Sequence, residues 1–281
     1  MKMDGFFKKV GDEIWFEEVD RDSLKISYKV KDILYSKRSK FQDIYIVNSY
    51  DFGKMLVIDG VVQTTERDGF IYNEMISHVP LSMHENPKNV LIIGGGDLGA
   101  AFEATKYPVE RIDVVEIDED VVKASLEYLK EISKDLKDER VNFIFEDGAK
   151  FVREKENEYD IIIVDSSDPI GPAEVLFSEN FYRDVYNALK EDGIMACQSE
   201  SPILYPDIFR ATYKKLKNIF PIVKISIATV PTYPGGFWSF TIGSKKYDKI
   251  NKVNDIDTKY VSKEILESSF NIPKFVQNII K

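Results

Sequence analysis

From Asn89 onward the chain repeats one pattern, in which a continuous apolar run ends in glycine or an acid and a helical pattern follows. The runs are "VLIIGGGD", "RIDVVEID", "VNFIFEDG", "YDIIIVDSS" and "GIMACQSE". Helical spacing appears between them in "DEDVVKASLEYLKEI" and "SENFYRDVYNALKED". Strand–helix alternation of this kind predicts a doubly wound, mostly parallel sheet with helices on both faces. We therefore expect an α/β, Rossmann-like domain over residues 66–281.

The segment before this domain has a different period. Residues 13–63 alternate apolar and polar in short runs such as "EIWFEEV" and "LKISYKV", with turn residues between them. This pattern predicts a small antiparallel β domain over residues 1–65. The stretch "DGFIYNEMISHVPL" has helical spacing and we expect the helix to stop at Pro80. Near the end, "KISIATVPTYPGGFWSFTIGSKKY" predicts an antiparallel pair at the edge of the larger sheet.

Composition excludes several classes of partner. The formal net charge of −10 disfavours nucleic acid and acidic membrane surfaces and would attract a cationic small substrate. The single Cys197 fits a reducing compartment, and with only His78 and His84 we expect no zinc-type ligand cluster and no metal. The N-terminal stretch lacks a signal peptide's apolar region, and no stretch is apolar enough for a membrane span. We expect a cytoplasmic protein.

Carboxylates follow the apolar runs at the positions where a ligand would bind. In open α/β sheets, ligands lie beyond the carboxyl ends of the strands. Asp97 follows the first run, Glu116 ends the second, Asp147 follows the third, and Asp165 and Asp168 follow the fourth. This edge of the predicted sheet is therefore acidic.

The glycine-rich turn before Asp97 allows close approach to a ligand, but its acid does not suit a dinucleotide. Asp97 would repel a pyrophosphate and favours a cationic ligand instead. Glu116 falls 22 residues after Gly94, where a carboxylate can bind the hydroxyl groups of a ribose. The alternatives are a tight turn without a ligand, a solvated strand end at Glu116, and an N-cap role for Asp147 at a helix near Ala149. We favour a nucleoside that carries a positive charge, with Phe145 beside its adenine.

Asp165 and Asp168 lie on a loop that Pro169 and Pro172 keep from becoming helical. An alkyl amine has a pKa of about 10.4, so it arrives protonated and is not a nucleophile. One acid can remove a proton while the other anchors the ammonium group. Simple capping of the loop is the alternative.

Segments along the whole chain resemble the polyamine aminopropyltransferases. They include "EIWFEE", "VIDGVVQTTERDGFIYNEMISHVPL", "NPKNVLIIGGGD", "VVEIDEDVV", "VDSSDPIGPAEVLFSENFY" and "PTYPGGFWSFTIGSKKY". The resemblance implies transfer of an aminopropyl group from decarboxylated S-adenosylmethionine, a co-substrate, to an amine, with release of 5'-methylthioadenosine and with no cofactor. Putrescine, giving spermidine, is the expected acceptor. Agmatine, cadaverine or a longer polyamine are alternatives.

The resemblance also implies roles for individual residues. Asp165 would be the catalytic base and Tyr72 would help to orient the attacking nitrogen, while residues 172–177 would form a loop that covers the site. The residues implied to bind the nucleoside are Gln42, Asp97, Glu116, Asp147 and Gly148. Those implied to bind the amine are Gln63, Asp168, Gln198, Tyr233 and Trp238. Core packing is the alternative for the three aromatic residues.

Three residues depart from the family pattern: Leu98 in place of a glycine, Gly69 in place of an acid, and Asn73 in the motif "YNEM". We expect Gly69 and Asn73 to lie beside the amine channel, so they bear on which amine is accepted. An S-adenosylmethionine-dependent N-methyltransferase is a rival, but Asp97 would oppose the carboxylate of the full methionyl group. A non-enzymatic nucleoside sensor would leave Asp165 and Asp168 unexplained. The resemblance further implies a homodimer or homotetramer that associates through the N-terminal sheet.

Overall fold

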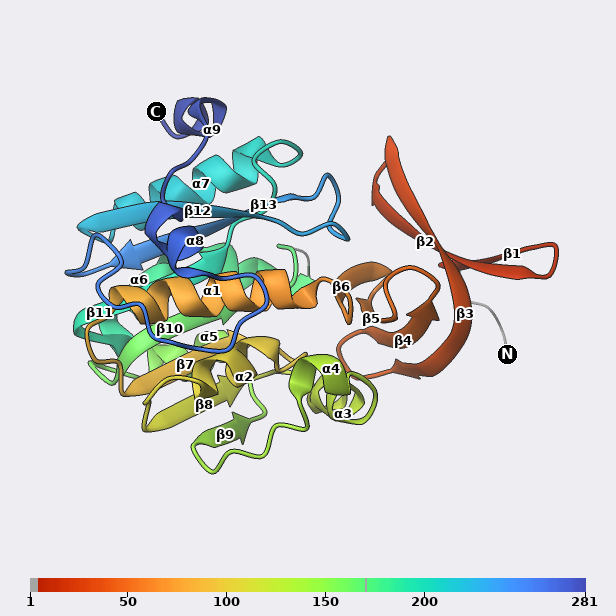
Figure 1. Ribbon diagram of the computed structural model, residues 1–281, viewed down its shortest axis with the longest axis horizontal. Coiled ribbons are helices and arrows are strands. Elements are labelled where there is room, and N and C mark those ends of the chain that lie inside the picture. Colours follow the sequence, from red (N-terminus) through yellow and green to blue (C-terminus); the bar gives the residue numbers. More distant parts are fainter. Residues whose placement is uncertain (1–4, 170) are drawn as a thin grey trace.

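The computed structural model describes residues 5–169 and 171–281, and it contains two sheets that lie side by side (Figure 1). The N-terminal sheet has six antiparallel strands in sequence order. Its strands are β1 (Phe7–Val10), β2 (Glu13–Arg21), β3 (Leu24–Arg38), β4 (Asp43–Ser49), β5 (Lys54–Ile58) and β6 (Val61–Thr65). The alternating apolar residues of these strands form a core of their own around Phe16, Tyr45 and Val57.

The second sheet has seven strands in the order β12-β13-β11-β10-β7-β8-β9. Strands β11, β10, β7, β8 and β9 pair in parallel, whereas β13 is antiparallel to both of its neighbours. The predicted edge pair is confirmed, with β12 outermost. The strands are β7 (Asn89–Gly94), β8 (Arg111–Val115), β9 (Val141–Ile144), β10 (Tyr159–Asp165), β11 (Leu189–Gln198), β12 (Ile222–Thr229) and β13 (Phe237–Ser244).

Alternate residues of the parallel strands face two separate apolar cores. Ile92 and Ile163 belong to one core, and Leu91 and Ile162 belong to the other, because successive strand residues point to opposite faces. This arrangement explains why the runs are continuously apolar. The helical elements are α1 (Gly69–Met83), α2 (Gly99–Thr105), α3 (Glu119–Tyr128), α4 (Lys130–Ser133), α5 (Gly148–Arg153), η1 (Gly171–Phe177), α6 (Glu179–Ala188), α7 (Pro206–Lys217), α8 (Lys263–Ser268) and α9 (Lys274–Ile279).

Two expected helix ends are wrong. Helix α1 continues past Pro80 to Met83, where the N–H of His84 donates to the carbonyl of Pro80 at 3.2 Å. Pro80 lies in the last turn, where burial among apolar neighbours outweighs the hydrogen bond that proline cannot make. Helix α6 ends at Ala188, because Leu189 already pairs with Tyr159 of β10. Among the described residues, no helix has the length and apolarity that crossing a membrane requires.

Candidate active site

The glycine turn after β7 is hydrogen-bonded directly to the last residue of β10. The N–H of Gly95 donates to the carbonyl oxygen of Asp165 at 2.9 Å. A Cβ on Gly94, whose φ is +82°, would lie 2.1 Å from that same oxygen, so glycine is required here. A backbone hydrogen bond therefore holds the two segments that carry Asp97 and Asp165 against each other.

A cavity of about 360 Å³ opens beyond this hydrogen bond, between the parallel sheet and the N-terminal sheet. Ten of the predicted site residues line it, and Phe41, Asp59 and Ile117 line it without having been predicted. The ten are Gln42, Gln63, Tyr72, Asp97, Glu116, Asp147, Gly148, Asp165, Asp168 and Tyr233. The structure thus brings together every residue predicted to contact the nucleoside.

Two of these acids are half-buried and held by hydrogen bonds. Asp97 accepts from the N–H of Gly99 at 3.0 Å and from the side-chain amide of Asn73 at 3.2 Å. Glu116 accepts from the N–H of Asp118 at 3.0 Å. Burial raises the pKa of Asp97, and it raises the pKa of Glu116 to about 7. A partner that donates hydrogen bonds or carries positive charge would therefore stabilise the ionised form of each carboxylate.

The other nucleoside-side residues are also fixed in place. Gln42 donates from its amide to Asp118 at 3.0 Å. One oxygen of Asp147 caps α5 by accepting from the N–H of Ala149 at 2.9 Å, as the N-cap alternative predicted. Asp147 also lines the cavity, so the two roles do not exclude each other. Phe145 was expected beside the adenine, but it is 43% exposed and does not line the cavity.

Asp165 lines the cavity, and its carboxylate lies next to Tyr72. Burial and the negative charge of Asp97 raise the pKa of Asp165 to about 8, and a hydrogen bond with the side chain of Tyr72 opposes this shift. The pKa of Tyr72 is raised well above its ordinary value, chiefly by burial. Tyr72 is therefore a neutral hydrogen-bond donor, and Asp165 has the pKa of a base that works near neutral pH.

A second cavity of about 210 Å³ continues from the first. Gln63, Tyr72, Asp168 and Tyr233 line both cavities, so the two are contiguous. Gln198 and Trp238 line the second cavity alone. All five residues predicted to bind the amine therefore surround one space that adjoins Tyr72.

The aromatic residues of this region pack against one another and also line the cavities. The ring centroids of Tyr72 and Tyr233 are 5.7 Å apart, and those of Tyr233 and Trp238 are 4.6 Å apart. The hydroxyl of Tyr233 donates to the carbonyl of Gln63 at 2.7 Å. Core packing and a binding role are therefore compatible at these positions, which form apolar walls between acids.

Three acids of the second cavity were missed: Glu18, Asp20 and Glu200. Glu18 and Asp20 lie on β2 of the N-terminal sheet, far in sequence from the strand ends. Glu200 follows β11, and its place in the "QSE" stretch at a strand end was a usable signal. Burial, followed by the charge of Asp168, raises the pKa of Glu200 to about 9.

The loop implied to cover the site forms the 3-10 helix η1. Three residues of this segment line the first cavity: Ala173, Val175 and Leu176. Ile170, which precedes it, lies outside the described residues. The covering segment is thus in contact with the cavity that it was expected to close.

None of the three residues that depart from the family pattern lines the second cavity. Neither Gly69 nor Asn73 lines either cavity, contrary to expectation. A Cβ on Gly69 would lie 2.3 Å from the hydroxyl of Thr64, which leaves no room for an acid, and Asn73 holds Asp97. Leu98 is fully buried and adopts a left-handed conformation with φ +68° at the N-cap of α2.

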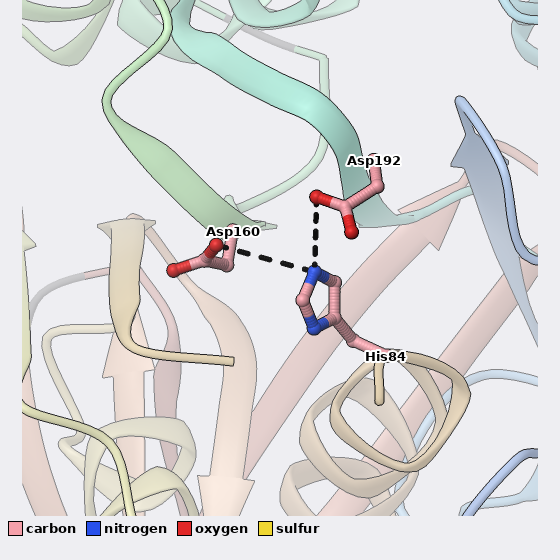
Figure 2. Close-up of side chains that lie close together, drawn as sticks. All are labelled: His84, Asp160 and Asp192. Atoms are coloured by element: carbon pink, nitrogen blue, oxygen red, sulfur yellow. Dashed lines mark ion pairs between the residues drawn. The ribbon is translucent and has the colours of Figure 1, made fainter. Parts of the chain in front are cut away.

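One further cluster was not predicted. His84 Nε2 lies 3.5 Å from Asp192 Oδ1 and 4.0 Å from Asp160 Oδ1 (Figure 2). His84 Nδ1 accepts from the N–H of Asn86 at 3.2 Å, so the neutral ring carries its proton on Nε2. A metal ion would need the lone pair of that nitrogen. The cluster is therefore a buried donor facing two carboxylates, at the opposite end of β10 from Asp165.

Fold and site together define an enzyme with two contiguous cavities beside a Rossmann-like sheet. Residues 69–255 match the model of the spermine/spermidine synthase domain, and residues 14–66 match that of the spermidine synthase tetramerisation domain. The chain belongs to the spermine/spermidine synthase family and is a polyamine aminopropyltransferase.

Individual relatives agree with this family. The polyamine aminopropyltransferase of Thermoanaerobacter sp. (strain X514) is 51% identical over 272 residues, which cover 95% of this chain and 98% of the relative. That of Methanocaldococcus jannaschii is 46% identical, and 95% of each chain is covered. A crystal structure of spermidine synthase in complex with the transition state analogue AdoDATO has a TM-score of 0.90 at 38% identity, covering 95% of this chain and 94% of that one. Spermidine synthase from Thermotoga maritima has a TM-score of 0.88 at 37% identity, with the same coverage.

Proposed function

We propose that this enzyme transfers the aminopropyl group of decarboxylated S-adenosylmethionine to putrescine, giving spermidine and 5'-methylthioadenosine. The observation that carries the proposal is the pair of contiguous cavities. One holds Asp97, Glu116 and Asp147, the other is lined by acids, and Tyr72 lines both. A donor and an acceptor can therefore bind at once and meet beside Asp165.

The donor cavity suits an adenosine derivative with a positive charge. In our proposal Glu116 accepts hydrogen bonds from the ribose hydroxyls and Asp147 from the exocyclic amine of adenine. Asp97 binds the ammonium group of the aminopropyl arm. Gln42 and Gly148 complete the contacts to the nucleoside. A methionyl carboxylate at the same place would face Asp97, which disfavours S-adenosylmethionine and hence methyl transfer.

The chemistry is an in-line displacement at carbon. The amine nitrogen, after loss of one proton to the carboxylate of Asp165, attacks the methylene carbon bonded to the sulfonium. A C–N bond forms, the C–S bond breaks, and sulfur keeps the electron pair as the neutral thioether of methylthioadenosine. Tyr72 orients the nitrogen and Asp168 holds the ammonium group at the other end of the acceptor. The sulfonium is already an activated leaving group, so we propose that no cofactor is needed.

The amine cavity supports a linear aliphatic acceptor with a cationic end. Its aromatic residues Tyr233 and Trp238 suit a polymethylene chain, while Gln63, Asp168 and Gln198 suit its ammonium ends. Putrescine fits this description. Agmatine, cadaverine and longer polyamines share the same chemistry and remain alternative acceptors.

The test is to incubate the enzyme with decarboxylated S-adenosylmethionine and each of these amines, and to identify the products by mass. We expect an increase corresponding to one aminopropyl group, most rapid with putrescine, together with methylthioadenosine. Calorimetry should show much tighter binding of decarboxylated S-adenosylmethionine than of S-adenosylmethionine. Equal affinity for the two donors, or a methylated product, would contradict the proposal.

The assembly is part of the same proposal. Residues 14–66 match a tetramerisation domain, which supports a homo-oligomer formed through the N-terminal sheet. Size-exclusion chromatography with light scattering tests it, and a monomer at micromolar concentration would contradict it.

A further inference from the structure

A buried carboxylate at the start of helix α1 has no part in the chemistry proposed above. Asp68 is 3% exposed and lines neither cavity. It occupies the N-cap position of α1, where an aspartate usually accepts a hydrogen bond from an N–H of the first helical turn. The side chain of Asp68 makes no such bond. Its oxygens bind groups outside the helix instead.

Both oxygens of the Asp68 carboxylate bind Thr232, which lies in the loop between β12 and β13. Oδ2 accepts from the N–H of Thr232 at 2.8 Å, and the Thr232 hydroxyl lies 2.7 Å from Oδ2 and 2.9 Å from Oδ1. Oδ1 also accepts from the hydroxyl of Thr65 at 2.6 Å. Both threonines are buried, so these bonds form away from water. Asp68 thus joins the end of β6, the start of α1 and a distant loop.

Each of these three segments carries a residue of the second cavity. Gln63 lies on β6, Tyr72 lies on α1, and Tyr233 directly follows the threonine of the loop. All three line the second cavity. The hydroxyl of Tyr233 donates to the carbonyl of Gln63 at 2.7 Å, and its ring centroid is 5.7 Å from that of Tyr72. A shift of one segment relative to another would therefore change the wall of the cavity.

The loop that carries Tyr233 is folded on itself and needs an external support. The N–H of Tyr233 donates to the carbonyl of Val230 at 3.0 Å, and the N–H of Gly236 donates to the carbonyl of Tyr233 at 2.8 Å. From the N-terminal sheet, the hydroxyl of Tyr28 donates to the carbonyl of Thr232 at 3.0 Å. The bonds from Thr232 to Asp68 connect the folded loop to the start of α1.

We propose that Asp68 is a positioning residue for the acceptor amine, which acts by holding the ring of Tyr233 against that of Tyr72 and so sets the shape of the second cavity. The proposal rests on the aminopropyl transfer proposed above. A carboxylate suits this role because its two oxygens accept from the N–H and the hydroxyl of Thr232 together, which fixes the orientation of the loop as well as its place. An amide has one acceptor oxygen, so asparagine cannot reproduce these bonds.

The experiment compares Asp68→Asn with Glu74→Gln as a matched control. Glu74 lies on the same helix, is 1% exposed, and accepts from the backbone N–H groups of residues 259–261 at 2.8 Å each. Neither Glu74 nor any of those three residues lines either cavity. Both variants therefore lose a buried carboxylate of α1, but only Asp68→Asn loses one that is bonded to the Tyr233 loop.

For each variant we would measure KM and kcat with putrescine, and the affinity for decarboxylated S-adenosylmethionine by calorimetry. Asp68→Asn should raise KM for putrescine about threefold or more, as expected when contacting residues are uncoupled. The affinity for the donor should stay unchanged, because Asp97, Glu116 and Asp147 do not contact the loop. Glu74→Gln should leave KM unchanged. An unchanged KM in Asp68→Asn, or the same rise in both variants, would overturn the proposal.

A double-mutant cycle distinguishes positioning from a general loss of structure. If Asp68 acts through the ring of Tyr233, Asp68→Asn should have little further effect on KM once Tyr233→Ala is present. Equal effects with and without the ring would contradict the proposal, because Asp68 would then act by another route.

Thr232 provides a second pair of variants in case Asp68→Asn does not fold. Thr232→Val keeps the shape of the side chain and loses its hydroxyl, whereas Thr232→Ser keeps the hydroxyl. We expect a raised KM for putrescine in the valine variant and a value close to that of the wild type in the serine variant. Equal values, or the reverse order, would count against the role of Asp68.

Calorimetry of putrescine binding provides a readout that does not need turnover. If the wild type neither binds putrescine nor forms methylthioadenosine from it and decarboxylated S-adenosylmethionine, the proposed function fails and this proposal fails with it. If the wild type does both, and the Asp68 and Thr232 variants bind putrescine as tightly as the wild type, the positioning role alone fails.

Discussion

Asp97 and Asp165 face one cavity, and the negative charge of Asp97 is, after burial, the largest cause that raises the pKa of Asp165. The acid proposed to bind the donor thus also tunes the acid proposed to take the proton. An amine with a pKa of about 10.4 loses its proton more readily to a carboxylate whose pKa is near 8 than to one near 4. The two proposed roles are therefore coupled through one electrostatic interaction.

Asp165→Asn should lower turnover at saturating amine by about 10²–10⁴-fold, the usual effect of losing a general base. Donor affinity, measured by calorimetry, should change little, because the proposed donor contacts remain. Raising the pH should restore part of the activity, since more amine then arrives without its proton. If turnover is retained, the base is elsewhere, and Tyr72 is the first residue to test.

Asp168→Asn should instead raise the KM for putrescine and leave kcat largely unchanged. A lost anchor weakens the ground state and the transition state together. Steady-state kinetics over a range of putrescine concentrations measures both constants. A fall in kcat with constant KM would assign Asp168 to the chemical step.

Asp97→Asn should weaken the binding of decarboxylated S-adenosylmethionine by roughly 1.5–3 kcal/mol, as expected for a charge-assisted contact. In the pH dependence of kcat/KM, the limb that reports the ionisation of Asp165 should also shift to lower pH. The sign follows because the charge of Asp97 raises the pKa of Asp165, and asparagine removes that charge. An unchanged pH profile together with unchanged donor affinity would leave Asp97 only its structural hydrogen bonds with Gly99 and Asn73.

Leu98 offers a test of backbone strain against burial. In most proteins alanine is less destabilising than glycine, but Leu98 has φ +68°, where a Cβ costs about 1–2 kcal/mol. Both Leu98→Ala and Leu98→Gly lose the buried side chain and should destabilise the protein. We expect the glycine variant to be no less stable than the alanine variant in denaturant unfolding. The usual order of the two would show that this backbone is not strained.

The ligand-free enzyme should become less stable as the pH rises from about 6 to about 9. Burial raises the pKa values of Glu18, Glu116, Asp165 and Glu200 above those of the unfolded chain. The folded protein therefore binds more protons in this range, and stability is lost as the pH rises through those values. Thermal unfolding should show a shallower pH dependence for Glu200→Gln than for the wild type. Identical slopes would mean that Glu200 is already ionised in the folded state.

The sequence was sufficient for the residues whose positions follow from strand ends. Asp97, Glu116, Asp147 and Asp165 each follow a parallel strand, and parallel strands bring their carboxyl ends to one edge. The family resemblance supplied residues without such a signal, including Gln42 and Trp238. All of these residues line the two cavities.

Glu18 shows why the remainder was missed. It follows Glu17 on β2, and nothing in the sequence tells the buried acid of this pair from the partly exposed one. Only the packing of one sheet beside the other carries it to the amine cavity. Helix α1 and Phe145 were misjudged for a related reason, because tertiary packing decides whether Pro80 ends a helix and which way a residue after a strand points.

The bond from Gly95 to the carbonyl of Asp165 has a consequence for how such enzymes can diversify. It joins the glycine turn after β7 and the proposed base, Asp165, into one unit, and Gly94 has no space for a side chain. Glu18 belongs to another sheet and makes no part of that unit. Substitutions on β2 can therefore reshape the second cavity while the bond between the glycine turn and Asp165 is inherited intact. Laboratory evolution toward unnatural amines should begin on that strand.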